Sequence, residues 1–180
     1  MNLYTITAQA IGIIAMAFNT LSYQQKSRST VIAMQMIGTF LFCINFYMLG
    51  ATMGCILNAL AAFRALIFLN KEKVHADHWG WFVGFLAVYA LSYGMTFTVF
   101  GTEATLRNLI LEFLPLMGMV AITISFRLSD AKAIRKYALI SSPCWLIYNI
   151  ANFSIGAIIC EVLSLCSILI GMLRLDRKTK

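Results

Sequence analysis

The chain has 180 residues, of which 61% are apolar and 12% are charged, and its formal net charge is +7. Soluble domains carry about 25% charged residues, so this composition excludes a soluble domain and predicts a membrane protein. The basic residues do not form a stripe on a folded surface but stand in short clusters between apolar runs. We therefore expect anionic lipid headgroups, and no nucleic acid, to be the partners of these clusters.

Seven apolar runs follow one another along the chain. They cover residues 7–23, 30–49, 53–70, 80–100, 106–126, 136–153 and 156–173. Each is within the range of about 17–25 residues that crosses a bilayer as a helix. A backbone in hydrocarbon must satisfy its own hydrogen bonds, which favours helices. The sequence therefore predicts a single all-α transmembrane domain with seven transmembrane helices, and no soluble catalytic domain.

The connections between the runs are of two kinds. Residues 50–52 and 154–155 form short neutral turns, whereas the remaining connections are charged. Twelve of the fourteen basic residues lie near the ends of the first, third, fifth and last runs: Lys26, Arg28, Lys71, Lys73, Arg127, Lys132, Arg135, Lys136, Arg174, Arg177, Lys178 and Lys180. All twelve fall on the cytoplasmic side if the N-terminus lies outside, as the positive-inside rule requires. We predict an N-out, C-in topology.

The runs group as three, one and three, and the two triplets share features. In each triplet a charged loop follows the first helix and a neutral turn follows the second, and segment 11–15 (IGIIA) is echoed by 117–121 (MGMVA). Polar residues recur in register at Asn45 and Asn149 before the turns, and at Asn58 and Glu161 after them. One intervening helix makes this a parallel repeat, as in several transporters. The predicted units are a first repeat (1–73), a linker helix (74–104) and a second repeat (105–180).

Two resemblances to known families follow from short segments. Segment 22–28 (SYQQKSR), after the first helix, resembles the loop of the PQ-loop and SWEET sugar-transporter superfamily, and the three-one-three grouping is similar to that of SWEET proteins. Further segments extend over nearly the whole chain: 49–50, 56–59, 114–118, 144–149 and 154–161. In these the chain resembles the YgjV family of bacterial inner membrane proteins.

The resemblance implies a multi-pass protein of the bacterial inner (cytoplasmic) membrane with a SWEET-like fold. SWEET-like proteins place an Asn of each third helix beside the substrate, which implies this role for Asn58. Glu161 stands at the matching position of the second repeat. If the repeats are real, Asn58 and Glu161 face each other across one cavity at equal depth.

Polar side chains within the spans point to a binding site, because a central charge costs about 2.5–3.5 kcal/mol to insert. A layer in the outer half of the bundle contains Glu112, Glu161 and several amides, and Trp145, Asn149 and Asn152 share one helical face. The layer either lines a cavity or bonds helix to helix, and Arg64, which lies deeper, either pairs with an acid of the layer or contacts a substrate. The predicted substrate-binding residues are Asn45, Asn58, Arg64, Glu112, Trp145, Asn149 and Glu161.

Motifs of other functions are missing from the sequence. The five cysteines lie in apolar runs without the spacing of a disulfide framework or a metal site. His75, Asp77 and His78 form one short cluster without a third firm metal ligand. No motif of an enzyme occurs, so we expect neither catalytic residues nor a cofactor.

Together these features predict a transporter for a small polar metabolite, working as a uniporter or as a proton-linked carrier. The alternative is a non-transporting receptor or accessory protein of the inner membrane on the same fold, since a fold does not determine a function. The sequence neither requires nor excludes a homodimer.

Overall fold

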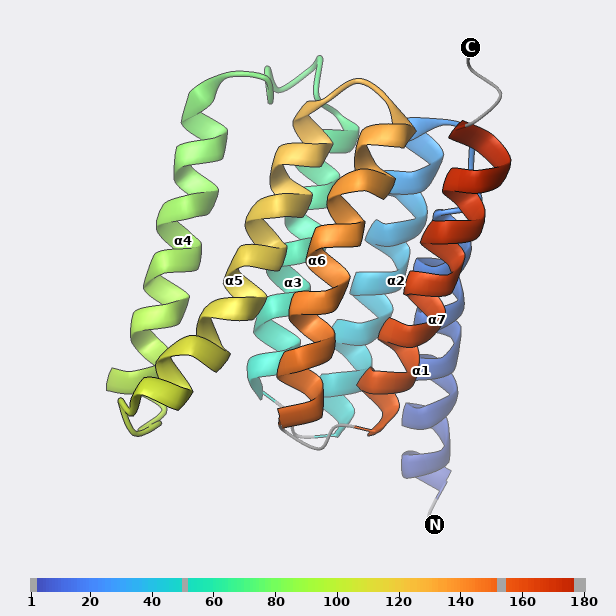
Figure 1. Cartoon of the computed structure of the whole chain (residues 1–180). Helices are drawn as coiled ribbons and strands as arrows, with labels where there is room; N and C mark the ends of the chain where they lie inside the picture. Colours follow the sequence, from blue (N-terminus) through green and yellow to red (C-terminus); the bar gives the residue numbers. More distant parts are fainter. Residues whose placement is uncertain (1–2, 50–51, 152–154, 177–180) are drawn as a thin grey trace.

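The computed structural model describes residues 3–49, 52–151 and 155–176, and it contains seven α-helices in those ranges (Figure 1). They are α1 (Leu3–Ser22), α2 (Arg28–Met48), α3 (Thr52–Leu69), α4 (Trp79–Thr98), α5 (Leu106–Arg127), α6 (Ala131–Ala151) and α7 (Ile155–Gly171). A π-helical turn, η1 (Met172–Asp176), continues α7. The described residues include no strand, so the prediction of an all-helical chain with seven helices is confirmed. Several residues named above lie outside the described ranges: Gly50, Ala51, Asn152, Ser154, Arg177, Lys178 and Lys180.

Five helical segments are long and apolar enough to cross a membrane: α1, α2, α4, α5 and Gly156–Asp176. The segment Cys55–Leu69 of α3 is apolar but shorter, and α6 carries three basic residues near its start. Large apolar side chains are exposed on all seven helices. An apolar surface of this extent requires a membrane or a partner to cover it.

Side chains cap the starts of three helices, and at α5 the cap is Thr105, which accepts from the N–H of Asn108. Asp130 accepts a hydrogen bond from the backbone N–H of Ala133, so α6 begins five residues before the predicted apolar run. Likewise His78 Nδ1 accepts from the N–H of Gly80, over 3.0 Å, at the start of α4. His78 of the His75–His78 cluster therefore caps a helix. The described residues contain no group of three or more His, Cys, Asp or Glu side chains that could hold a metal ion.

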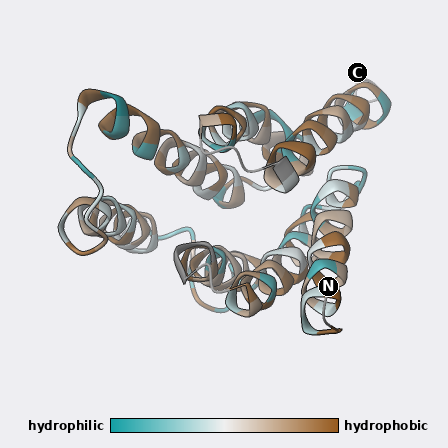
Figure 2. Cartoon of the chain, turned by 90° about the horizontal axis from the view of Figure 1, so that it is seen from below, coloured by the Kyte–Doolittle hydropathy of each residue, from teal (hydrophilic) through white to brown (hydrophobic). Residues whose placement is uncertain are grey.

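The helices pack as two triplets. Helix α2 lies between α1 and α3, α6 lies between α5 and α7, and α4 packs on α5. The triplets meet where α1 contacts α7, α3 contacts α5 and α2 contacts α6. Seen along the helices, the triplets form two rows, and α4 stands beyond α3 at the end of one row, beside the start of α5 (Figure 2).

The two ends of the bundle differ in charge and in packing. The connections α1–α2, α3–α4 and α5–α6 and the turn η1 lie at one end, at the top of Figure 1, which we call the basic end. The nine described residues of the predicted basic set belong to these segments and the adjoining helix ends. Much of the apolar core lies in this half, where Phe68 of α3, Phe126 of α5, Ile134 of α6 and Ile168 of α7 are buried.

Candidate functional site: a cavity beside Glu112

Arg64 lies in the middle of the bundle, where it joins α3 to α4 and α5. Its side chain is buried. The Nη1 atom donates hydrogen bonds to the hydroxyls of Tyr89 (3.1 Å) and Thr123 (3.4 Å) and to the carbonyl of Met119 (3.2 Å). The guanidinium also lies over the Phe126 ring, 5.4 Å from its centroid. These contacts make Arg64 the centre of a polar layer that joins three helices, while its buried Nε atom has no hydrogen-bond partner.

Arg64 does not form an ion pair with an acid of the outer half. In the described part of the chain the one ion pair is between Arg135 and Asp176. The Glu112 carboxyl is hydrogen-bonded to Tyr148, and the Glu161 carboxyl is hydrogen-bonded to Ser142. The two acids therefore lie in separate polar environments, each formed with a residue of α6.

A cavity of about 170 Å³ lies next to the Arg64 layer, on the side away from the basic end. Its lining comes from α3, α4, α5, α6 and the α4–α5 connection: Leu57, Tyr89, Ser92, Tyr93, Thr96, Phe100, Thr102, Glu112, Pro115, Leu116, Met119 and Tyr148. Tyr89 and Met119 also contact Arg64, so the Arg64 layer is the floor of the cavity. Thr102 belongs to the α4–α5 connection, so the cavity extends towards the end opposite the basic end.

Three of the six hydroxyls that line this cavity already donate their proton to the backbone. Ser92 donates to the carbonyl of Val88, Thr96 to that of Ser92, and Tyr93 to that of Leu109, over 2.9–3.1 Å. Their oxygens keep lone pairs that can accept a further hydrogen bond. With the Glu112 carboxyl, the cavity therefore presents mainly acceptors, which suit a ligand rich in N–H or O–H donors.

Pro115 belongs to the cavity wall and also shapes it. Proline has no backbone N–H and crowds the preceding turn, so it weakens the helix around it. Figure 1 shows the first half of α5 leaning towards α4 and away from α6. Glu112 lies in this half, on the segment that reaches across the cavity.

The equal depth expected for three polar residues agrees with the helix bounds. Asn58, Glu112 and Glu161 are each the seventh residue of their helix, and all three helices begin at the end opposite the basic end. Among the predicted binding residues, however, only Glu112 lines the cavity. The neighbour of Asn58, Leu57, lines it as well, whereas Glu161 contacts α6 outside it.

The other predicted binding residues pack between helices. Asn45 is buried, and its Nδ2 donates to the carbonyl of Ala8 of α1 over 2.7 Å, above Gly12. Trp145 packs on Gly118 of α5, and Asn149 is buried on α6. Asn45 and Trp145 thus contact a neighbouring helix within their own triplet.

Basic residues tie the two triplets together at the basic end. Arg28 of α2 donates to the carbonyls of Phe68, Phe126 and Leu128, the last over 2.8 Å. The Lys71 ammonium donates to the carbonyl of Arg127 over 2.6 Å. These cations therefore cap the carbonyl ends of α3 and α5, where the helix dipole favours positive charge.

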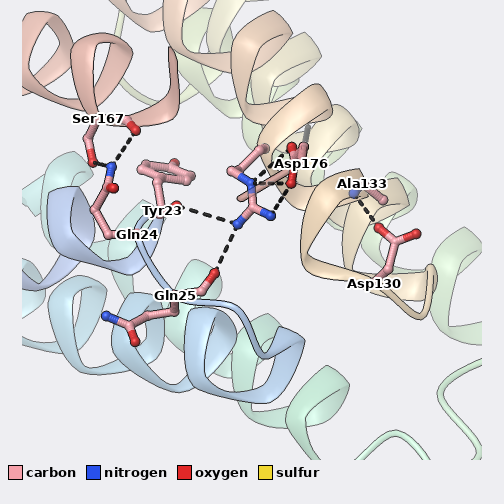
Figure 3. Close-up of polar contacts among 8 residues, drawn as sticks. Tyr23, Gln24, Gln25, Asp130, Ala133, Ser167 and Asp176 are labelled. Atoms are coloured by element: carbon pink, nitrogen blue, oxygen red, sulfur yellow. Dashed lines mark hydrogen bonds and ion pairs between the residues drawn. The ribbon is translucent and has the colours of Figure 1, made fainter. Parts of the chain in front are cut away.

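Arg135 of α6 makes a second tie. It forms an ion pair with Asp176 and donates to the backbone carbonyls of Tyr23 and Gln25 (Figure 3). The adjacent Gln24 donates to the hydroxyl of Ser167. Segment 22–28, which resembles the PQ-loop segment, therefore binds α6 and α7. The sequence predicted only that Arg28 and Arg135 orient the protein in the membrane. Their carbonyl partners at Leu128 and Gln25 lie about a hundred residues away in the chain, so no sequence pattern indicates these hydrogen bonds.

Comparison with known families identifies the chain. A model of the family Imp-YgjV, described as bacterial inner membrane protein, matches residues 6–179. The chain belongs to this family. Searches of curated proteins and of solved structures each found no match. Membership in Imp-YgjV confirms the predicted YgjV resemblance and, with the apolar helices, makes the chain a protein of a bacterial inner membrane family.

Proposed function

We propose that the chain transports a small metabolite that carries an amine or several hydroxyl groups. The observation that carries this proposal is the cavity beside Glu112, whose largely apolar lining contains six hydroxyl groups and the Glu112 carboxyl. Its volume, about 170 Å³, is below the range of about 300–1,000 Å³ found for sites that hold drug-sized ligands. The substrate class is therefore a compact metabolite. In this proposal Glu112 pairs with the amine of the substrate. The hydroxyl oxygens of the cavity accept hydrogen bonds from the other N–H and O–H groups of the substrate.

The orientation proposed for the transporter follows from the charges. With the basic end in the cytoplasm, as the positive-inside rule favours, the N-terminus lies outside and the cavity faces the outer side. The Arg64 layer and the contacts of Arg28 and Arg135 then separate the cavity from the cytoplasm. This arrangement corresponds to the outward-facing state of a carrier.

Helix contacts support a parallel repeat, an arrangement that occurs in several transporter families. A twofold axis that exchanges α1 with α5, α2 with α6 and α3 with α7 converts the α1–α7 contact into the α5–α3 contact. It also maps the α2–α6 contact onto itself. Gly12 of α1 contacts Asn45 of α2, and Gly118 of α5 contacts Trp145 of α6. The echoed glycines therefore serve the same packing role in both triplets.

Purified protein in liposomes tests the proposal. A panel of labelled small amines, amino acids and polyols is assayed for uptake, and the same compounds are assayed for thermal stabilisation of the protein. We expect uptake of at least one compound, and a large loss of uptake in Glu112→Gln. Glu103→Gln is the matched control, because Glu103 is an exposed acid of the α4–α5 connection outside the cavity. If no compound of the panel were taken up and none stabilised the protein, the proposal of transport would lose its support.

A receptor or accessory role is the second candidate. It is favoured by the many polar side chains that are bonded to backbone carbonyls at the basic end, which hold the triplets together on that side. A receptor keeps these contacts throughout its cycle, whereas a carrier must break them. Thermal stabilisation by a compound without any uptake of that compound would favour the receptor.

A further inference from the structure

Glu161 is a second intramembrane acid, separate from the cavity. Its carboxyl is hydrogen-bonded to the Ser142 hydroxyl, and Ser142 is buried. In the described part of the chain no basic side chain pairs with it. An ionised carboxylate without a cation costs much free energy in an apolar environment, and taking up a proton removes that cost.

We propose that Glu161 is a proton-binding site, connected to the basic end by a line of buried hydroxyl and amide groups. Only one consequence of this proposal, a carrier whose transport is coupled to protons, rests on the proposed transport function. Binding and exchange of the proton at Glu161 need no substrate and can be measured without one.

The line begins on α7, between Glu161 and the basic end. Ser164 and Ser167 follow Glu161 at intervals of three residues. Residues three apart are neighbours on a helix surface, so the three side chains succeed one another about one turn apart along α7. Both serines are buried. Ser167 Oγ donates to the carbonyl of Thr20 of α1 over 2.6 Å and accepts from Gln24 Nε2 over 2.9 Å (Figure 3 shows the latter contact).

Two buried atoms beside Ser167 support a path for water. Thr20 Oγ1 and Gln24 Oε1 have no hydrogen-bond partner although both are inaccessible. Buried polar atoms of this kind normally bind an ordered water. Both residues contact Ser167, so water bound there continues the line from α7 to the α1–α2 loop at the basic end.

The groups around Glu161 leave the carboxyl as the one acid of the line. Cys160 precedes it on α7, and its thiol is hydrogen-bonded to Ser164. Tyr23 of the α1–α2 loop lies close enough to interact electrostatically with Glu161. Arg135, at the far end of the line, is already paired with Asp176. From α6 the facing group is the Ser142 hydroxyl.

The transfer itself is a simple proton exchange. The Glu161 acid gives its proton to water near Ser164 and becomes a carboxylate, which Ser142 stabilises by donating its hydroxyl. The Ser167 hydroxyl then turns from the Thr20 carbonyl, gives its own proton to the water at Thr20 and Gln24, and takes one from the water near Ser164. The water at Thr20 and Gln24 releases a proton to solvent at the basic end. The reverse sequence reloads Glu161, so no proton is gained or lost in the cycle.

Infrared spectroscopy of the full-length protein in lipid nanodiscs tests the site. We expect a carboxylic acid C=O band that is lost in Glu161→Gln, stays in Glu112→Gln, and shifts in frequency in Ser142→Ala. A spectrum without a band assignable to Glu161, from acidic to neutral pH, would overturn the proposal. Ser142→Ala keeps the test valid if Glu161→Gln proves unstable, because it alters the same band without removing the acid.

Transfer into D₂O tests the path. In Ser164→Ala and Ser167→Ala the Glu161 band should exchange about tenfold more slowly, since each variant lacks one hydrogen-bonding hydroxyl of the line. Ser125→Ala is the control, because Ser125 is an equally buried serine of α5 that bonds only within its own helix. Equal exchange rates in all three variants would overturn the path. Normal proton exchange without transport of any compound would refute the transport function and leave the Glu161 site intact.

Discussion

Arg135 and Asp176 form an ion pair in which the two side chains are only 3% and 8% exposed. The pair joins the start of α6 to η1, and the Nη1 atom of Arg135 donates to the backbone carbonyls of Tyr23 and Gln25 in the α1–α2 loop. The α1–α2 loop, α6 and η1 thus meet on one guanidinium.

Removing one member of this pair should destabilise the protein strongly. Arg135→Leu leaves Asp176 without its cation, and breaking a buried pair costs about 3–5 kcal/mol. Lys136→Gln is the control, because Lys136 is the exposed neighbour on the same helix. Thermal unfolding in detergent measures both variants. The double variant Arg135→Leu, Asp176→Leu should recover part of the loss, and no recovery would mean that the ion pair is not the source of the stability.

Glycines at two positions should respond in opposite directions to alanine. A Cβ on Gly171 would lie 2.4 Å from the carbonyl oxygen of Tyr23, a backbone atom that cannot move without displacing the α1–α2 loop. Gly94, inside α4, has nothing within 4 Å of the added Cβ. Gly171→Ala should therefore lower the unfolding temperature, whereas Gly94→Ala should stabilise α4 by about 0.8–1.0 kcal/mol. Equal effects would contradict the close contact between α7 and the loop.

The sequence predicted the parts of this fold that depend on composition along the chain. Apolar runs of membrane length gave the seven helices, and the basic clusters marked the end at which Arg28 and Arg135 lie. The start of α6 was placed too late because capping by Asp130 extends the helix beyond its apolar run.

The candidate site was only partly predictable. Equal depth of Glu112 and Glu161 follows from counting residues, but the side on which each points depends on how its helix is rotated against its neighbours. That rotation brings Glu112 to Tyr148 and Glu161 to Ser142. The cavity lining also depends on α4, whose tyrosines and hydroxyls carry no charge and so gave no signal in the sequence.

The α2–α3 hairpin contains two cysteines in contact. The Sγ atoms of Cys43 and Cys55 are 3.3 Å apart, near the end of the bundle opposite the basic end. A disulfide needs an S–S distance of about 2.0 Å, so a small shift suffices. Mild oxidation with copper phenanthroline should cross-link this pair and protect two thiols from alkylation, as counted by mass spectrometry. Cys43→Ser should abolish the protection, whereas Cys166→Ser, which removes an exposed thiol of α7, should not. Alkylation of both thiols after oxidation would contradict the α2–α3 packing.

Glu112 and Tyr148 provide the most direct test of the cavity. Tyr148→Phe removes the hydroxyl that bonds the carboxyl but keeps the ring, which lies edge-on to Trp145 with centroids 6.1 Å apart. The hydroxyl orients the Glu112 carboxyl, so without it binding of an amine substrate should weaken roughly tenfold, as for the loss of one hydrogen bond of about 1.5 kcal/mol. The fold should be unaffected, since the ring contacts remain. Isothermal titration with the compound found in the uptake panel measures the affinity. Unchanged affinity in both Tyr148→Phe and Glu112→Gln would show that the substrate binds elsewhere, and the cavity would lose its assignment.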